Sequence, residues 1–172
     1  MSSFVFHADG QPDWHRAVPI GIMTASAIAL GSAYIAEYGF SLEPCALCLY
    51  QRVPYALAGV LGIAALSLPR TSRANLVALA ALLFAIGAGL AFYHVGVEQH
   101  WWASAAGCGG TLPLSMSADD LQAALMAPPD PACDEPTWVV FGISMATWNT
   151  GISLALAALA WQGYERMRGR QR

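Results

Sequence analysis

Residues 43–54 read Glu-Pro-Cys-Ala-Leu-Cys-Leu-Tyr-Gln-Arg-Val-Pro, and their two cysteines lie where a polar connection becomes a hydrophobic run. If the chain becomes helical near Cys45, both sulfurs lie in the first helical turn, where free N–H groups and the helix dipole favour a thiolate. Arg52 follows Cys48 by four residues, a spacing that brings two side chains onto one helical face. The stretch therefore predicts a redox dithiol with a fixed positive charge beside it.

Composition places this dithiol in a membrane protein. Of the 172 residues, 56% are hydrophobic and 11% are charged, whereas about 25% of residues are charged in ordinary soluble domains. Four windows between charged residues can each hold the roughly 17 to 25 residues of a spanning helix. We expect one all-α membrane domain over residues 1–172, an antiparallel bundle of four transmembrane helices at about 17–36, 50–68, 74–97 and 138–161. A long loop, at about 98–137, joins the third helix to the fourth.

The basic residues predict how this bundle is oriented. Arg16 precedes the first span, Arg70 and Arg73 lie between the second and third, and four arginines follow the fourth: Arg166, Arg168, Arg170 and Arg172. The positive-inside rule therefore puts both termini in the cytoplasm and the cysteines on the opposite side. Disulfides persist in the periplasm and in the extracellular space, so a dithiol on that side can cycle with a disulfide.

The expected topology brings four polar or reactive groups to the outer layer of the membrane: Cys45, Cys48, Arg52 and His94. An arginine within a span is costly unless it has a partner, which makes Arg52 a functional candidate. Pro54 fits either the first turn of a helix that starts late or a kink in one that starts at Cys45. The long loop carries Cys108 and Cys133, and exchange between two dithiols requires direct attack of sulfur on sulfur.

Four segments together resemble one protein family. They are Cys-Ala-Leu-Cys-Leu-Tyr-Gln-Arg at 45–52, Tyr-His-Val-Gly-Val-Glu at 93–98, the two loop cysteines, and Ser-Met-Ala-Thr-Trp-Asn at 144–149. In this order and spacing the chain resembles the bacterial disulfide-bond formation protein B (DsbB) family. The resemblance implies a four-helix inner-membrane protein that reoxidises a periplasmic DsbA-type dithiol oxidase and passes the electrons to ubiquinone or menaquinone, neither covalently bound, with no metal.

The resemblance also implies a role for each candidate residue. Cys108 would form the mixed disulfide with the partner protein, and Cys133 would exchange with Cys45. Cys48 would then be the thiolate that donates to the quinone. Arg52 would bind the quinone oxygen and stabilise negative charge on it, and His94 would contact the quinone or donate a proton. The chain departs from the family at Gln51, where the best-known members commonly have an acidic residue.

Other interpretations of the same residues remain open. The cysteines and His94 are soft ligands, so a metal-handling membrane protein is the alternative function. The two loop cysteines would also suit a structural disulfide, and in a third interpretation all the disulfides only brace a scaffold. For Arg52 alone, the alternative is a side chain that only extends to the membrane surface. For His94, it is an interfacial histidine bonded to a neighbouring carbonyl or to Glu98. We expect the lipid bilayer as a partner and no nucleic acid.

Overall fold

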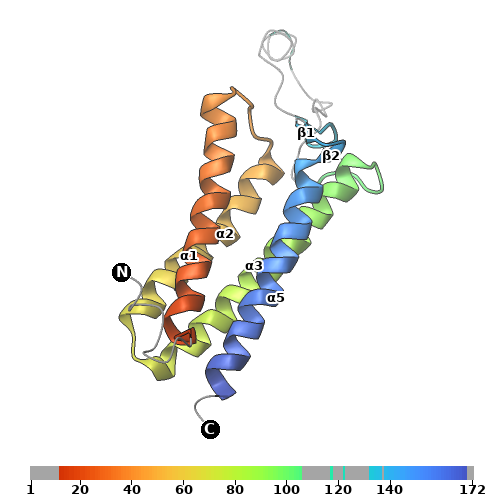
Figure 1. Ribbon diagram of the computed structural model, residues 1–172. Coiled ribbons are helices and arrows are strands. Elements are labelled where there is room, and N and C mark those ends of the chain that lie inside the picture. The colour runs from red at the N-terminus through yellow and green to blue at the C-terminus, as the bar shows by residue number, and fades with distance from the viewer. Residues whose placement is uncertain (1–11, 106–116, 118–121, 123–131, 137, 170–172) are drawn as a thin grey trace.

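The computed structural model describes residues 12–105, 117, 122, 132–136 and 138–169, and these are mostly helical (Figure 1). The long helices are α1 (Trp14–Tyr34), α2 (Ala46–Ser67), α3 (Arg70–Glu98) and α5 (Met145–Gly169). A π-helical segment, η2 (Ile35–Gly39), continues α1. Helix α3 packs along both α2 and α5, and α1 packs mainly on α2. The prediction of an all-helical bundle holds for these four helices, with one small β-hairpin added.

Three segments are long and apolar enough to cross a membrane: Trp14–Gly39, Ala46–Ser67 and Ser72–Glu98. They match the first three predicted spans, and many of their large apolar side chains are exposed on the outside of the bundle, as lipid contact requires. Helix α5 is not among them; it has Asn149 and Thr150 in its first turns and Glu165 and Arg166 in its last. The chain is therefore a multi-pass membrane protein with three such segments among the described residues.

The starts of α2 and α3 differ from the prediction. Helix α2 begins at Ala46, with Cys45 as its N-cap, rather than at about residue 50, and Pro54 consequently lies inside the helix. Pro54 packs on α3 at Gly87, where a Cβ atom would be only 3.3 Å from the Pro54 Cβ atom. The expected loop of residues 69–73 is also shorter, because α3 already begins at Arg70. Only Leu68 and Pro69 separate α2 from α3, which forces the two helices to be antiparallel neighbours.

A β-hairpin occupies the start of the predicted fourth span. Strands β1 (Val139–Val140) and β2 (Ile143–Ser144) pair antiparallel, so the helix begins at Met145 instead of at about residue 138. The two residues of the turn, Phe141 and Gly142, both have positive φ, which is the type I′ turn of tight hairpins. The Ser144 hydroxyl then accepts a hydrogen bond from the backbone N–H of Thr147 and caps α5.

The ends of three elements meet at one end of the bundle. Asp13, which caps α1, accepts a hydrogen bond from Arg70 at 3.1 Å. The Arg166 guanidinium near the end of α5 lies 4.5 Å from the centroid of the Trp14 ring. The start of α1, the α2–α3 turn and the end of α5 are thus together, and Arg73 also reaches the backbone of His15 there. The dithiol lies at the opposite end.

Glycine at 163 permits close approach of α5 to α1, and we expect its replacement to be costly. In Gly163→Ala the new Cβ atom would lie 2.7 Å from a methyl of Val18, and such overpacking typically costs about 1 to 3 kcal/mol. Gly151 lies on the same helix with nothing within 4 Å of its Cβ position, so Gly151→Ala should gain up to about 1 kcal/mol from helix propensity. Both variants are compared with the wild type by their free energy of unfolding in mixed micelles. Equal changes in the two variants would contradict the close packing of α5 on α1.

Candidate redox site

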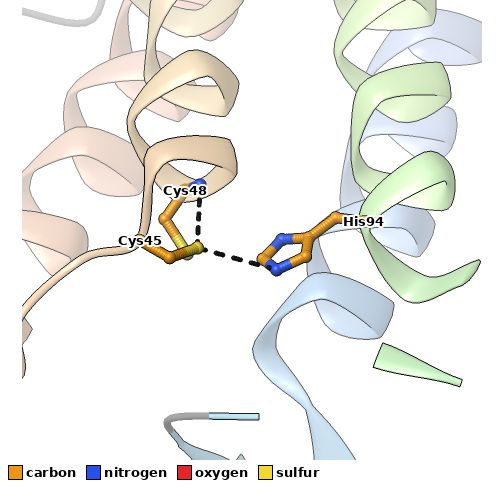
Figure 2. A group of neighbouring side chains, drawn as sticks. All are labelled: Cys45, Cys48 and His94. Carbon is orange, nitrogen blue, oxygen red and sulfur yellow. Dashed lines mark hydrogen bonds between the residues drawn. The ribbon is translucent and has the colours of Figure 1, made fainter. Parts of the chain in front are cut away.

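The first turn of α2 holds the two sulfurs together. Cys45 has an extended backbone and its Sγ atom accepts a hydrogen bond from the backbone N–H of Cys48 at 3.3 Å. The Sγ atoms of Cys45 and Cys48 are themselves hydrogen-bonded at 2.9 Å, and both cysteines are free (Figure 2). The N-cap position gives Cys45 the role that serine or aspartate usually has, so its sulfur sits where a negative charge is favoured.

Cys45 is the thiolate of this pair. The pKa of Cys45 is lowered from 9.0 to about 4, chiefly by the hydrogen bond with the Cys48 side chain, with further contributions from His94 and from the Cys48 backbone; burial opposes the shift. His94 reaches across from α3, with its Nε2 atom 3.7 Å from the Cys45 Sγ atom (Figure 2). The role of Cys48 as the thiolate that acts on a quinone stays a prediction.

Alkylation of the reduced protein should reveal the Cys45 thiolate. The reaction rate of an ordinary thiol rises about tenfold per pH unit until the pH reaches its pKa of about 8.5, because only the thiolate is the nucleophile. With its pKa lowered to about 4, Cys45 should react with iodoacetamide at a rate that is nearly constant between about pH 6 and 8. Mass spectrometry of the labelled peptide separates Cys45 from Cys48. A rate that climbs tenfold per unit over this range would show that Cys45 is protonated there.

Cys133 lies against the dithiol. It is buried and disulfide-bonded, and it packs in one apolar cluster with Cys45, Leu47 and Val97. The His94 ring also makes a hydrogen bond with the Cys133 backbone. Cys133 of the long loop therefore lies close to Cys45, the residue with which the family resemblance implies that it exchanges. Cys108, the other loop cysteine, lies outside the described residues.

Arg52 has a partner that the sequence analysis did not identify. Its Nη1 atom donates a hydrogen bond to Glu37 on the π-helical segment η2, and its guanidinium lies 5.0 Å from the centroid of the Tyr34 ring. The side chains of Arg52 and Glu37 are only 16% and 20% exposed. An arginine that only extended to the membrane surface would not be held in this way, so the charge is fixed at one place beside the dithiol.

A cavity of about 230 Å³ lies between the helices at this end. Its polar lining consists mainly of Cys48, Gln51, Arg52, His94, Glu98 and Asn149, and its apolar walls include Ala29, Leu30, Ala33, Ala36, Trp138 and Ile152. A second, wholly apolar hollow of about 370 Å³ shares several of these walls, among them Ala36, Trp138 and Ile152. A mostly apolar space with a few convergent polar groups is typical of a small-molecule site.

Buried polar groups connect the helices behind the dithiol. Gln51 donates a hydrogen bond to the Nδ1 atom of His94 at 2.8 Å and accepts one from Asn149. Asn149 in turn accepts a hydrogen bond from the Tyr55 hydroxyl at 2.7 Å. Gln51 and Tyr55 were not among the predicted site residues, although their i, i+4 spacing within a span was a usable signal, since polar residues there normally find partners.

Glu98 is a further residue that the sequence analysis did not assign. Its side chain is 5% exposed, and its Oε1 atom lies 3.9 Å from the Nε2 atom of His94. Its Oε2 atom is buried and makes no hydrogen bond with any described residue. Because a buried carboxylate oxygen without a donor is destabilising, Glu98 is available for a polar group in the cavity that it lines.

The predicted metal alternative also has a geometric basis. Cys45, Cys48 and His94 each offer one ligand atom, and these three atoms lie within 4.8 Å of one another. Thiolate and imidazole are the ligands that zinc and copper favour. Three ligands alone do not separate a metal site from a redox dithiol with a neighbouring histidine.

Comparisons with known proteins agree on one family. The profile described as "Disulfide bond formation protein DsbB" matches residues 15–162. The chain is 31% identical over 143 residues to "Disulfide bond formation protein B 2" of Pseudomonas syringae, covering 76% of this chain and 79% of the relative. It is 28% identical over 181 residues to "Disulfide bond formation protein B" of Aromatoleum aromaticum, covering 98% and 99%. It is also 29% identical over 146 residues to "Uncharacterized protein RP370" of Rickettsia prowazekii, covering 84% of each. No solved structure matches the chain at a significant level.

Proposed function

Because the chain belongs to the DsbB family of disulfide-forming membrane oxidoreductases, we propose that it is a quinone-dependent thiol oxidase. Its donor is a periplasmic thioredoxin-like protein of the DsbA type, and its acceptor is ubiquinone or menaquinone of the membrane pool. A relay of this kind keeps the bacterial periplasm oxidising. The observation that carries the proposal is the meeting of Cys133, the Cys45–Cys48 dithiol and the Arg52 cation at one end of the bundle.

The thiol steps use the four cysteines in sequence. A thiolate of the reduced partner attacks Cys108, which breaks the Cys108–Cys133 disulfide and forms a mixed disulfide with the partner. The second thiolate of the partner resolves this bond, so the partner leaves oxidised and Cys108 and Cys133 are left as thiols. Cys133 then attacks the Cys45 sulfur of the Cys45–Cys48 disulfide, and Cys108 resolves the Cys45–Cys133 bond. Each attack breaks one S–S bond and forms one, so two electrons reach Cys45 and Cys48.

The cavity residues fit a quinone. Glu98 presents a buried oxygen with no hydrogen-bond partner among the described residues, Arg52 a fixed positive charge and His94 an imidazole. A quinone bound there would accept two electrons and two protons. In this site the Cys45–Cys48 disulfide would re-form, with Cys48 as the thiolate next to the quinone, and two electrons would pass to the quinone, which would take its two protons from the site and from water. Arg52 would hold the head group, with His94 lining the same cavity, and the fixed charge of Arg52 would stabilise the developing oxyanion. The apolar hollow beside the cavity suits the apolar part of such a molecule.

We also propose the orientation expected from the sequence in a bacterial inner membrane. Both termini lie in the cytoplasm, α5 is the fourth span, and the cysteines face the periplasm. The arginines support this topology, because Arg70, Arg73 and Arg166 gather at the end of the bundle opposite the dithiol. The antiparallel course of α3 and α5 leaves the segment between them on the periplasmic side.

Quinone reduction by the purified protein tests the proposal. The protein in detergent receives a reduced DsbA-type protein as donor, and the loss of quinone absorbance is followed with a ubiquinone and with a menaquinone analogue. Turnover that depends on the donor and yields one disulfide per quinone supports the proposal. No turnover with either quinone, together with stoichiometric zinc or copper in the protein as purified, would replace it with the metal-handling alternative.

A further inference from the structure

Gln51 has no role in the steps above, although it lies at the centre of the buried polar groups. Its side chain is nearly inaccessible on α2, and it contacts three helices: Leu47 on its own helix, His94 on α3 and Asn149 on α5. We propose that Gln51 is a positioning residue that holds His94 as a neutral imidazole whose Nε2–H points at the Cys45 sulfur. The consequence for catalysis rests on the proposed function, but the arrangement of protons does not.

The orientation of the Gln51 amide follows from its neighbours. Its Nε2 atom lies 3.2 Å from the backbone carbonyl oxygen of Leu47, and a carbonyl oxygen can only accept a hydrogen bond. The amide nitrogen must therefore face that oxygen, because the reverse orientation would place two acceptors against each other. At the other side, the Oε1 atom accepts a hydrogen bond from the Asn149 amide, whose own oxygen accepts from Tyr55 and Ser153.

This orientation determines where the proton of His94 lies. The same Gln51 Nε2 atom is 2.8 Å from the Nδ1 atom of His94, so Nδ1 accepts a hydrogen bond and carries no proton. A neutral ring must then have its hydrogen on Nε2, the atom that lies 3.7 Å from the Cys45 Sγ atom. An imidazolium would need a second proton on Nδ1, where it would face the N–H of Gln51. Formation of the imidazolium therefore requires the Gln51 contact to break.

The surrounding charges would otherwise favour the imidazolium. His94 faces the sulfurs of Cys45 and Cys48 from the start of α2 and the carboxylate of Glu98 on its own helix. Cys133 does not titrate while it is disulfide-bonded, but its backbone makes a hydrogen bond with the His94 ring, and α5 contributes the neutral Asn149. Arg52 lines the same cavity and is paired with Glu37. Burial of the ring disfavours any charge on it, and the neutral donor at Nδ1 is the hydrogen-bonding partner that opposes its protonation.

A fixed neutral donor suits the exchange at Cys45. When the mixed disulfide of Cys45 with Cys133 is resolved, the S–S bond breaks and the electron pair stays on Cys45 as a thiolate. The Nε2–H of His94 then stabilises this leaving group by a hydrogen bond without giving up its proton. Because the ring does not change its charge near neutral pH, its hydrogen bond to the leaving sulfur stays the same over the range in which a free histidine would titrate.

Nitrogen NMR of histidine-labelled, reduced protein in detergent tests the proposal directly. The two ring nitrogens of His94, assigned by comparison with His94→Asn, should show an unprotonated Nδ1 and a protonated Nε2 throughout about pH 5.5 to 8. A protonated Nδ1 in the wild-type protein would overturn the proposal. The measurement needs neither quinone nor partner protein. The proton arrangement of His94 can therefore be confirmed even if quinone reduction fails, and it can be contradicted even if quinone reduction succeeds.

Two substitutions of Gln51 separate positioning from packing. In Gln51→Glu a carboxylate oxygen faces His94, so a proton should appear on Nδ1. Gln51→Met removes the N–H donor but keeps a side chain of similar volume. His94 should then titrate between about pH 5.5 and 8, and the alkylation rate of Cys45 should change over the same pH range. Gln162→Glu, at an exposed position on α5, is the matched control and should leave the spectrum unchanged. If both Gln51 variants keep the wild-type nitrogen signals and pH profile, Gln51 does not position His94.

Discussion

Cys48→Ser should abolish quinone reduction, with turnover lowered by at least about 10³-fold, as when a reacting nucleophile is removed. The physical reason is that a serine hydroxyl cannot form a disulfide with Cys45, so the electrons of the partner have no route to a quinone. Steady-state turnover with a reduced DsbA-type donor measures the effect. Cys45 and Cys48 are both free thiols in the structure. Cys48→Ser therefore removes no disulfide from this structure, and a loss of turnover reports on the reaction.

The same variant should still receive the partner. Cys108 and Cys133 remain intact in Cys48→Ser, so the mixed disulfide with the donor protein should form at the wild-type rate in non-reducing gels. Wild-type turnover in Cys48→Ser would remove the dithiol from the reaction and would leave the scaffold interpretation of these cysteines.

Arg52→Gln should lower the quinone turnover number by about 10² to 10³-fold, the range found when one donor to a developing oxyanion is removed. The guanidinium is held by Glu37 and the Tyr34 ring, so the positive charge needs no rearrangement during the reaction. The measurement is turnover at saturating quinone, with alkylation of Cys45 as the check that the first turn of α2 is intact.

Glu37→Gln provides the matched control for Arg52. It removes the ion pair but leaves the guanidinium, so it should cost far less turnover than Arg52→Gln if the charge acts on the quinone. Equal losses in the two variants would mean that the pair contributes only by holding η2 against α2. The double variant then distinguishes the two effects, since coupled residues are not additive.

The sequence predicted the helical bundle and the location of the dithiol because both depend on local patterns. Long windows without charge determine the spans, and a Cys-x-x-Cys motif at the start of such a window determines the first turn of α2. The positions of Arg52 and His94 near the dithiol followed from topology, since α2 and α3 run in opposite directions. The roles of the four cysteines, Arg52 and His94 remain predictions.

The rest of the site depends on tertiary contacts that no local pattern encodes. Glu37 reaches Arg52 because a π-helical segment continues α1, and nothing in the sequence distinguishes that segment from an ordinary helix end. Pro54 is compatible with two starts of α2, and in the structure it lies inside the helix, where it packs on Gly87 of α3. The hairpin before α5 replaced the expected first turns of a span, because Phe141 and Gly142 adopt positive φ.

The cap at the start of α2 also has a consequence for the oxidising strength of the dithiol. The Cys45 thiolate is stabilised by the Cys48 N–H and by His94, and these contacts weaken when Cys45 is part of a disulfide. Stabilising the reduced form raises the reduction potential, by about 30 mV for each 1.4 kcal/mol. The Cys45–Cys48 pair should therefore be more oxidising than an ordinary structural disulfide, so electrons move towards the membrane. Equilibration of the pair with glutathione, with Cys108 and Cys133 replaced by alanine, would measure this potential.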